Sequence, residues 1–241
     1  MTHAADDTPL DFESFKKELN FSKEDIYREL YQQNGHHIRI KKEAVAIRGL
    51  RTIIESTLTL ATSSGFHAMS LRDLCAHSGF SIGGIYAYIK NKEDLLHLIQ
   101  SYGFLLTRKT LDTRTRNLPP GPVKLNTAIR VHLFLSELMP TWFSFSFMEA
   151  RNLPDLEKQR TVRLSGQIED LFMDILQEGM AQKLFRQADA RLLAALTKAM
   201  MQDWYLRHSR YRRQGIDVGT YAQQVYDMLR DYLDPASGEI H

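Results

Sequence analysis

Apolar residues recur along this chain at the spacing of amphipathic helices. From Lys41 onward they return every three or four positions, as at Ile47, Leu50 and Ile54. This period places them on one face of a helix. Nowhere do apolar and polar residues alternate over a useful length, as they do in a half-buried strand. The pattern therefore predicts an all-α protein.

Capping residues and helix breakers divide the pattern into separate helices. Gly65 ends the helix that begins near Lys41, because glycine is a common residue just after a helix. The segment 118–122 (LPPGP) ends the helix that Asn91 opens, because proline lacks the amide donor that a helix needs. Two short amphipathic stretches precede these helices, between residues 10 and 33. After the prolines we expect helices at about 123–139, 141–151, 155–182, 188–210 and 217–233.

The segment 70–90 (SLRDLCAHSGFSIGGIYAYIK) combines two helix starts with a glycine turn. Ser70 and Asp73 have the spacing of a capping box, in which each side chain accepts a hydrogen bond from the other residue's amide. Gly79 suits a turn with positive φ, and Ser81 is a suitable N-cap for the next helix. Helix, turn and helix at this spacing are typical of a helix-turn-helix, whose second helix lies in the major groove of DNA.

The second helix of this motif, expected at residues 82–89, has one face almost without side chains. At about 100° per residue, Ile85 points inward and the pair Gly83-Gly84 points away from it. Two glycines weaken a helix by about 1 kcal/mol each relative to alanine, which indicates that the backbone closely approaches a partner. Tyr86 and Tyr88 on the flanks would then reach phosphates. The expected DNA contacts are Lys41, Lys42, Ser70, Arg72, Ser81, Ile82, Gly83, Gly84, Tyr86, Tyr88, Lys90 and Lys92.

The stretch from about Leu50 to Ile99 is similar to the N-terminal domain of TetR-family transcriptional regulators. It has the family's helix ending in glycine, Ser-capped second helix, glycine turn, tyrosine-ended recognition helix and Lys-Glu pair opening a fourth helix. The resemblance implies DNA contacts at or beside the positions of Ser70, Ser81, Gly84, Tyr86, Tyr88 and Lys92. Two features depart from the family pattern: Tyr88 stands where histidine is common, and some 40 residues precede the first helix.

This resemblance implies a division into an N-terminal extension (1–40), a DNA-binding domain (41–91) and a helical effector-binding and dimerisation domain (92–241). It also implies a ligand-responsive regulator, a repressor, that binds a pseudo-palindromic operator as a homodimer and is released by an apolar effector. Three roles remain open for the extension. It would lengthen the first helix, pack on the domain, or reach the minor groove through Arg39, Lys41 and Lys42.

The C-terminal half has apolar residues for a dimer interface and for a cavity. The apolar stripes in 188–210 and 217–233 would either pair with those of a second subunit or pack against their own subunit. The segment 141–148 (TWFSFSFM) would line a cavity or fill a dense core. Arg151, Arg130 and His132 are candidate anchors for an acidic head group. The expected effector contacts are Tyr102, Phe134, Leu138, Trp142, Phe145, Met148, Arg151, Phe172, Ile175 and Trp204.

The stretch 203–215 resembles C-terminal segments of family members that sense acyl-CoA thioesters. We therefore favour an acyl-CoA or fatty acid as the effector, with an aromatic compound as the alternative.

Composition and charge narrow the function classes. The chain has 241 residues, 43% of them apolar, and its single cysteine, Cys75, forms neither an intrachain disulfide nor a multi-cysteine metal site. The net charge is +2, but residues 41–116 carry 11 basic and 6 acidic side chains, which suits a polyanion partner or a solvated helical face. No apolar run approaches the roughly 18 residues of a membrane span, and no secretory leader is present, so we expect a cytoplasmic protein.

Enzyme motifs are absent or out of context. Residues 79–83 match G-x-S-x-G formally, but the hydrolase serine needs a strand-to-helix turn, and here a capped helix precedes it. No H-E-x-x-H, P-loop or G-x-G-x-x-G occurs. We expect no enzymatic activity, no cofactor and no metal. The alternative function is a helix-turn-helix protein that binds DNA without small-molecule input, in an architectural or constitutive role.

Overall fold

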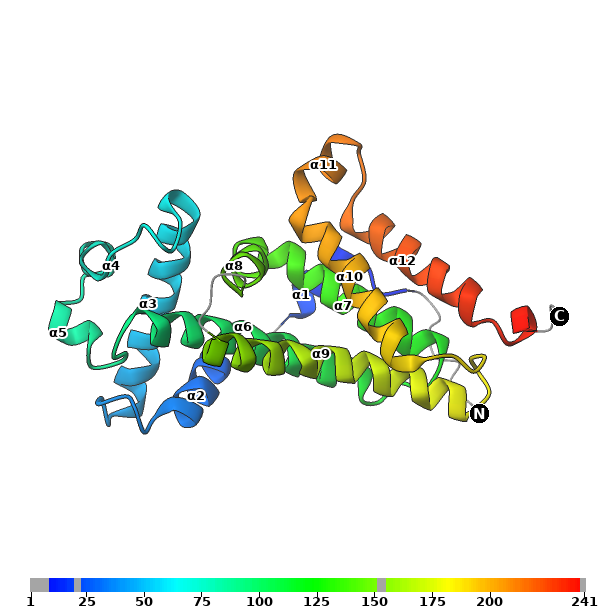
Figure 1. The fold of residues 1–241 in the computed structure, drawn as a ribbon, viewed down its shortest axis with the longest axis horizontal. Helices are drawn as coiled ribbons and strands as arrows, with labels where there is room; N and C mark the ends of the chain where they lie inside the picture. The colour runs from blue at the N-terminus through cyan, green and yellow to red at the C-terminus, as the bar shows by residue number, and fades with distance from the viewer. Residues whose placement is uncertain (1–8, 20–22, 151–154, 239–241) are drawn as a thin grey trace. The chain divides into compact units, whose positions relative to one another are not determined.

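The computed structural model describes residues 9–19, 23–150 and 155–238, and these residues form helices and no strand (Figure 1). The all-α prediction is confirmed. No helix in these ranges is long and apolar enough to cross a membrane. The chain forms two compact units. The N-terminal unit contains residues 20–106 and 141–164, and the C-terminal unit contains residues 1–19, 107–140 and 165–241.

The N-terminal unit is built around a long helix. It contains α2 (Lys23–Asn34), α3 (Glu43–Ser64), α4 (Leu71–Ser78), α5 (Ile82–Ile85), the first part of α6 (Lys92–Thr115) and most of α8 (Pro140–Ala150). Helix α3 packs against α2 on one side and α4 on another, and α4 packs against α5. Fully buried apolar side chains, such as Leu30 of α2 and Ile53 of α3, fill the interior.

The C-terminal unit is organised around α7 (Pro122–Leu138), which packs against α1, α10 and α12. Its other helices are α1 (Phe12–Glu18), the end of α6, most of α9 (Asp155–Ala181), α10 (Ala190–Leu206), α11 (His208–Arg213) and α12 (Val218–Leu233), followed by the 3-10 turn η1 (Pro235–Gly238). Every residue of α7 from Ala128 to Ser136 is buried. A helix that is buried all round needs neighbours on every side, which explains its central place.

The N-terminal extension is divided between the two units. Phe12 and Phe15 of α1 pack on Phe134 of α7, with ring centroids 5.4 and 5.6 Å apart, in the C-terminal unit. Helix α2 packs on α3 in the N-terminal unit. Of the three roles considered for the extension, packing on the rest of the protein is observed.

Two helices differ from the expected ranges. The predicted helix 188–210 is interrupted at Arg207, which separates α10 from α11. The recognition helix expected at 82–89 is α-helical only over Ile82–Ile85, and turns continue it to Tyr88. The short length agrees with the low helix propensity of the Gly83-Gly84 pair.

Candidate nucleic-acid interface

The start of α4 is fixed by the predicted capping box. The Ser70 hydroxyl oxygen accepts from the Asp73 amide at 3.2 Å, and the Asp73 carboxylate accepts from the Ser70 amide at 2.8 Å. These hydrogen bonds with Ser70 lower the pKa of the Asp73 carboxyl, although desolvation opposes them. Because the cap uses the hydroxyl of Ser70, the first turn of α4 is held in one position.

The turn between α4 and α5 has the predicted chemistry. Gly79 adopts φ 76° and ψ 5°, a left-handed conformation that glycine adopts without strain, and its amide donates to the Cys75 carbonyl. The Ser81 side chain accepts from the Gly84 amide at 3.1 Å and caps α5. Leu74 and Ile85 are fully buried between the helices. The helix-turn-helix is therefore observed, with each local signal in its expected place.

One face of α5 is exposed and carries few side-chain atoms. Ile82 is 46% exposed and Tyr86 is 43% exposed, and Ser81 and Gly83 lie beside them at the surface. A Cβ added at Gly83 would meet no atom within 4 Å. Gly84 is half-buried, and a Cβ there would lie 3.0 Å from Phe80. This face leaves room for a partner to approach the backbone of α5.

Tyr88 requires a correction, because it faces the interior and not a flank of α5. Its side chain is 4% exposed, and its hydroxyl donates to the Val45 carbonyl at 3.2 Å. Gly49 of α3 makes room for the ring, since a Cβ at that position would lie 2.0 Å from the hydroxyl oxygen. Burial raises the pKa of Tyr88, so the hydroxyl stays a donor. Tyr88 joins α3 to the recognition segment.

The lysines assigned to DNA have different surroundings. Lys41, Lys42 and Lys90 are exposed, as is Arg72 on α4. Lys92 instead donates its ammonium group to the carbonyls of His67 and Met69 at 2.9 and 2.7 Å, and lies over the Phe66 ring. The ammonium group of Lys92 therefore holds the loop between α3 and α4.

The extension brings a further cation to this face. The Arg39 amide donates to the Ala87 carbonyl at 2.8 Å, and the Arg39 side chain is exposed. The Tyr31 hydroxyl donates to the Ile40 carbonyl, so the same segment is also tied to α2. Arg39 was named in one of the roles considered for the extension, but the sequence did not indicate this backbone contact with the turn after α5.

The aromatic residues assigned to an effector fall in both units. In the N-terminal unit, Tyr102 stacks on Tyr27, and the Trp142 ring lies against Gly103 and donates to the Ile99 carbonyl at 2.8 Å. Phe145 packs on Phe66, and Met148 is 57% exposed. Arg151 lies outside the described residues.

The C-terminal unit holds the remaining members of that set. Phe134, Phe172, Ile175 and Trp204 are buried, and Leu138 is half-buried. Trp204 stacks on Tyr211 with ring centroids 5.6 Å apart. In each unit, most of these side chains contact other parts of the same unit.

His132 is not suited to anchor an acidic head group. Burial and, to a lesser extent, the nearby positive charge of Lys198 together lower the pKa of the imidazole to about 3. A histidine with such a pKa is neutral at physiological pH. The described residues also include no group of three or more His, Cys, Asp or Glu side chains that could hold a metal ion.

A capped helix-turn-helix in an all-α chain is typical of DNA-binding regulators. Residues 53–99 match the profile described as bacterial regulatory proteins of the tetR family, and residues 121–232 match the tetracyclin repressor-like C-terminal domain. The chain belongs to the TetR family. Members of this family are DNA-binding transcription regulators and not enzymes. No curated protein matches the chain in sequence.

Solved structures share the fold. A tetR-family regulatory protein from Rhodococcus RHA1 is 16% identical, covers 77% of this chain and 97% of its own, and has a TM-score of 0.69. FadR from Bacillus subtilis, in complex with stearoyl-CoA, is 19% identical, with coverages of 76% and 98% and a TM-score of 0.67. AibR, in complex with isovaleryl coenzyme A and operator DNA, is 20% identical, with coverages of 78% and 98% and a TM-score of 0.63. At these identities the likeness shows the fold alone.

Proposed function

We propose that this regulator binds an operator through α4 and α5 and represses transcription until an effector releases it. The exposed, nearly bare face of α5 supports this proposal most directly. Its backbone near Gly83 can approach a groove, while Ser81, Ile82 and Tyr86 surround the approach. Arg39, Lys41, Lys42, Arg72 and Lys90 are exposed cations for phosphates. An operator-binding regulator acts where the chromosome is, in the cytoplasm.

We propose that two copies of the chain bind one pseudo-palindromic operator. The support is an apolar surface on α10 and α12, where Leu192 is 55% exposed, Leu196 50%, Met228 55% and Tyr232 46%. An exposed apolar patch on two adjacent helices is typical of a protein interface. A two-fold pairing of α10 and α12 would make a four-helix interface.

We propose an apolar effector, either an acyl-CoA or a fatty acid. The acyl-CoA complexes of FadR and AibR support this class. In the C-terminal unit, the candidate contacts are Phe134, Leu138, Phe172, Ile175 and Trp204. In the N-terminal unit, they are Tyr102, Trp142, Phe145 and Met148. Helix α6 contributes residues to both units and follows the recognition segment, so it can transmit a change of conformation between effector and operator.

The operator proposal is tested by selecting binding sites for the full-length protein from random duplex DNA. We expect the selected DNA to be a pseudo-palindromic sequence. Tyr86→Ala should lower the affinity for it at least about tenfold, which is the magnitude of a charge-assisted hydrogen bond. Tyr86→Phe separates the hydroxyl from the ring, and both variants should keep the wild-type melting temperature because the side chain is exposed. Unchanged operator affinity in Tyr86→Ala would contradict the assigned orientation of α5.

The effector proposal is tested with the selected operator and a panel of acyl-CoAs, fatty acids and aromatic compounds. An effector should raise the melting temperature and weaken operator binding, because it binds one conformation more tightly than the other. If no compound in the panel does both, the alternative of DNA binding without small-molecule input is favoured.

A further inference from the structure

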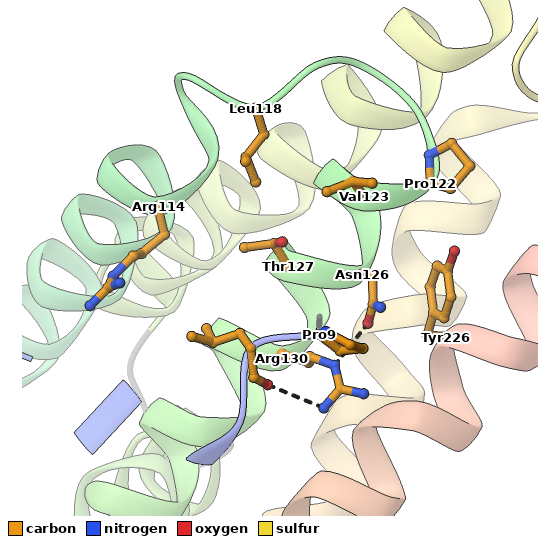
Figure 2. Close-up of a pocket in the computed structure, with 10 residues that line it drawn as sticks. Pro9, Arg114, Leu118, Pro122, Val123, Asn126, Thr127, Arg130 and Tyr226 are labelled. Atoms are coloured by element: carbon orange, nitrogen blue, oxygen red, sulfur yellow. Dashed lines mark hydrogen bonds between the residues drawn. The ribbon is translucent and has the colours of Figure 1, made fainter. Parts of the chain in front are cut away.

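A cavity of about 530 Å³ opens in the C-terminal unit, and none of the aromatic residues assigned to the effector lines it (Figure 2). It lies among the N-terminal segment before α1, the end of α6, the start of α7 and α12. This volume is in the range of small-molecule sites. Its lining residues are Pro9, Leu10, Arg114, Leu118, Pro122, Val123, Asn126, Thr127, Arg130 and Tyr226.

Arg130 is a buried cation at this cavity, and its hydrogen bonds go to neutral groups. It is only 7% exposed. Its guanidinium donates to the Asn126 side chain at 3.0 Å, to the Leu10 carbonyl at 3.3 Å and to the Gln223 side chain. Figure 2 shows the first two of these bonds. Three bonds leave further N–H groups of the guanidinium for another acceptor.

Asp227, whose charge acts on Arg130, already has other partners. Asp227 accepts from Arg230 at 2.8 Å and from the Gln223 amide at 2.9 Å. Burial lowers the pKa of the Arg130 guanidinium, and Asp227 only partly offsets this effect. A buried guanidinium remains charged and is stabilised by a direct anionic partner.

The remaining walls favour an anion with an apolar body. None of the described lining residues is acidic, and Arg114 adds a second cation, although Glu18 pairs with it at 2.7 Å. Helix α7 begins at the cavity, at Pro122, without a side-chain cap, and the N-terminus of a helix is electropositive. Leu118 and Val123 supply apolar surface.

We propose that this cavity binds a small oxyanion, a carboxylate or a phosphate ester, that carries an apolar chain. Arg130 and the start of α7 bind the charged group, and the apolar walls contact the chain. Pro9 and Leu10 of the extension close the site, so the extension is part of it. This inference rests on the proposed function, because the ligand is of the same chemical class as the proposed effector. It adds a second site, which shares no residue with the aromatic effector contacts and includes the extension.

The test is direct binding to the full-length protein, measured by calorimetry and thermal melting. The probes are hexanoate, hexyl phosphate, hexanol and inorganic phosphate. We expect hexanoate or hexyl phosphate to bind, and the stronger of the two identifies the anionic group. Hexanol and inorganic phosphate should bind at least about tenfold more weakly, since each lacks one half of the recognised chemistry.

Variants locate the binding site. Arg130→Gln removes the buried charge, and Val123→Trp fills the cavity from a position that is 42% exposed and tolerates substitution better. Each should weaken hexanoate binding at least about tenfold. Arg108→Gln is the matched control, because this exposed arginine of α6 does not line the cavity. Val123→Trp decides the matter if Arg130→Gln fails to fold.

Several results would overturn the inference: no binding of either amphiphile, equal binding of hexanol, preference for inorganic phosphate, or unchanged binding in Val123→Trp. If hexanoate binds wild type and Val123→Trp equally and also weakens operator binding, the effector proposal survives and this site does not. If the protein binds no selected operator but binds hexanoate in this cavity, the operator proposal fails and this inference stands.

Discussion

Gly49 and Gly83 lie in the same helix-turn-helix region, but their surroundings are opposite. The missing side chain of Gly49 leaves the space that the Tyr88 ring occupies. At Gly83 the space is open to solvent. The fold therefore requires a glycine at position 49, but it does not require one at position 83.

This difference predicts opposite results for two alanine substitutions. Gly49→Ala should destabilise the protein by about 2 kcal/mol, the usual magnitude for an overpacked interior. Gly83→Ala should raise the free energy of unfolding by up to about 1 kcal/mol through helix propensity, yet reduce operator affinity. Denaturant titration and operator binding measure the two effects. Full operator affinity in Gly83→Ala would remove the bare face of α5 from the interface.

His132 gives a prediction about pH. Its folded pKa of about 3 lies below the ordinary histidine pKa of 6.5, so the unfolded chain binds the proton more readily. Stability is therefore lost as the pH falls from 6.5 towards 3, by up to about 1.4 kcal/mol per pH unit. Denaturant titrations at several pH values in this range should show that the free energy of unfolding falls less steeply with decreasing pH in His132→Gln than in wild type. The exposed His77, changed to glutamine, serves as the control, and equal slopes in all three proteins would contradict the burial of the imidazole.

At the scale of elements, helix ends were predictable from local residues, and orientations that depend on distant contacts were not. Ser70, Gly79 and Ser81 fix their helix ends by hydrogen bonds or backbone angles within a few positions. Tyr88 was assigned to a flank because the helix was expected to continue to Ile89, whereas its orientation depends on Gly49 and Val45, about 40 residues earlier.

The surface on which α1 packs could not be predicted from the sequence pattern either. A seven-residue amphipathic segment could pack on many apolar surfaces, and only the position of Phe134 selects one. The exposed candidates Ser81, Ile82, Gly83 and Tyr86 were found from the sequence because a capped helix start determines them locally.

The docking of α1 can be tested at Phe15, which is fully buried. Removing a buried phenylalanine ring costs about 3 to 5 kcal/mol, and Phe15 is the buried residue of this seven-residue helix. Phe15→Ala should release α1, and hydrogen exchange of the α1 amides should accelerate while that of α3 is unchanged. Glu13→Ala, at an exposed position of the same helix, should have no such effect. Protected α1 amides in Phe15→Ala would show that Phe15 does not anchor the helix.

At the scale of the whole molecule, each unit gathers segments that are far apart in sequence. The C-terminal unit combines residues 1–19 with 107–140 and 165–241. Its apolar surface on α10 and α12 is the feature that a second copy would cover. Dimerisation and operator binding are then coupled, because two linked recognition helices bind two half-sites together.

Leu196→Glu should test this coupling. A charge on the exposed apolar surface should give a monomer at micromolar concentration, measured by light scattering, with a melting temperature that becomes independent of protein concentration. Operator affinity should fall by about a hundredfold, because the two half-sites no longer bind as one unit. The control Leu184→Glu changes an apolar residue that is 41% exposed and lies outside α10 and α12. A dimeric Leu196→Glu would exclude this surface as the interface.

Because α1 and α2 of the extension pack in different units, the extension restricts how chimaeric regulators can be built. A junction near Lys92 would look natural for exchanging the helix-turn-helix with that of a relative. However, α1 would then be exchanged together with the helix-turn-helix, although Phe12 and Phe15 of α1 pack on α7, which stays with the recipient. A working hybrid must keep residues 9–19 with the C-terminal unit and make its first junction between α1 and α2, so the exchange needs two junctions and not one.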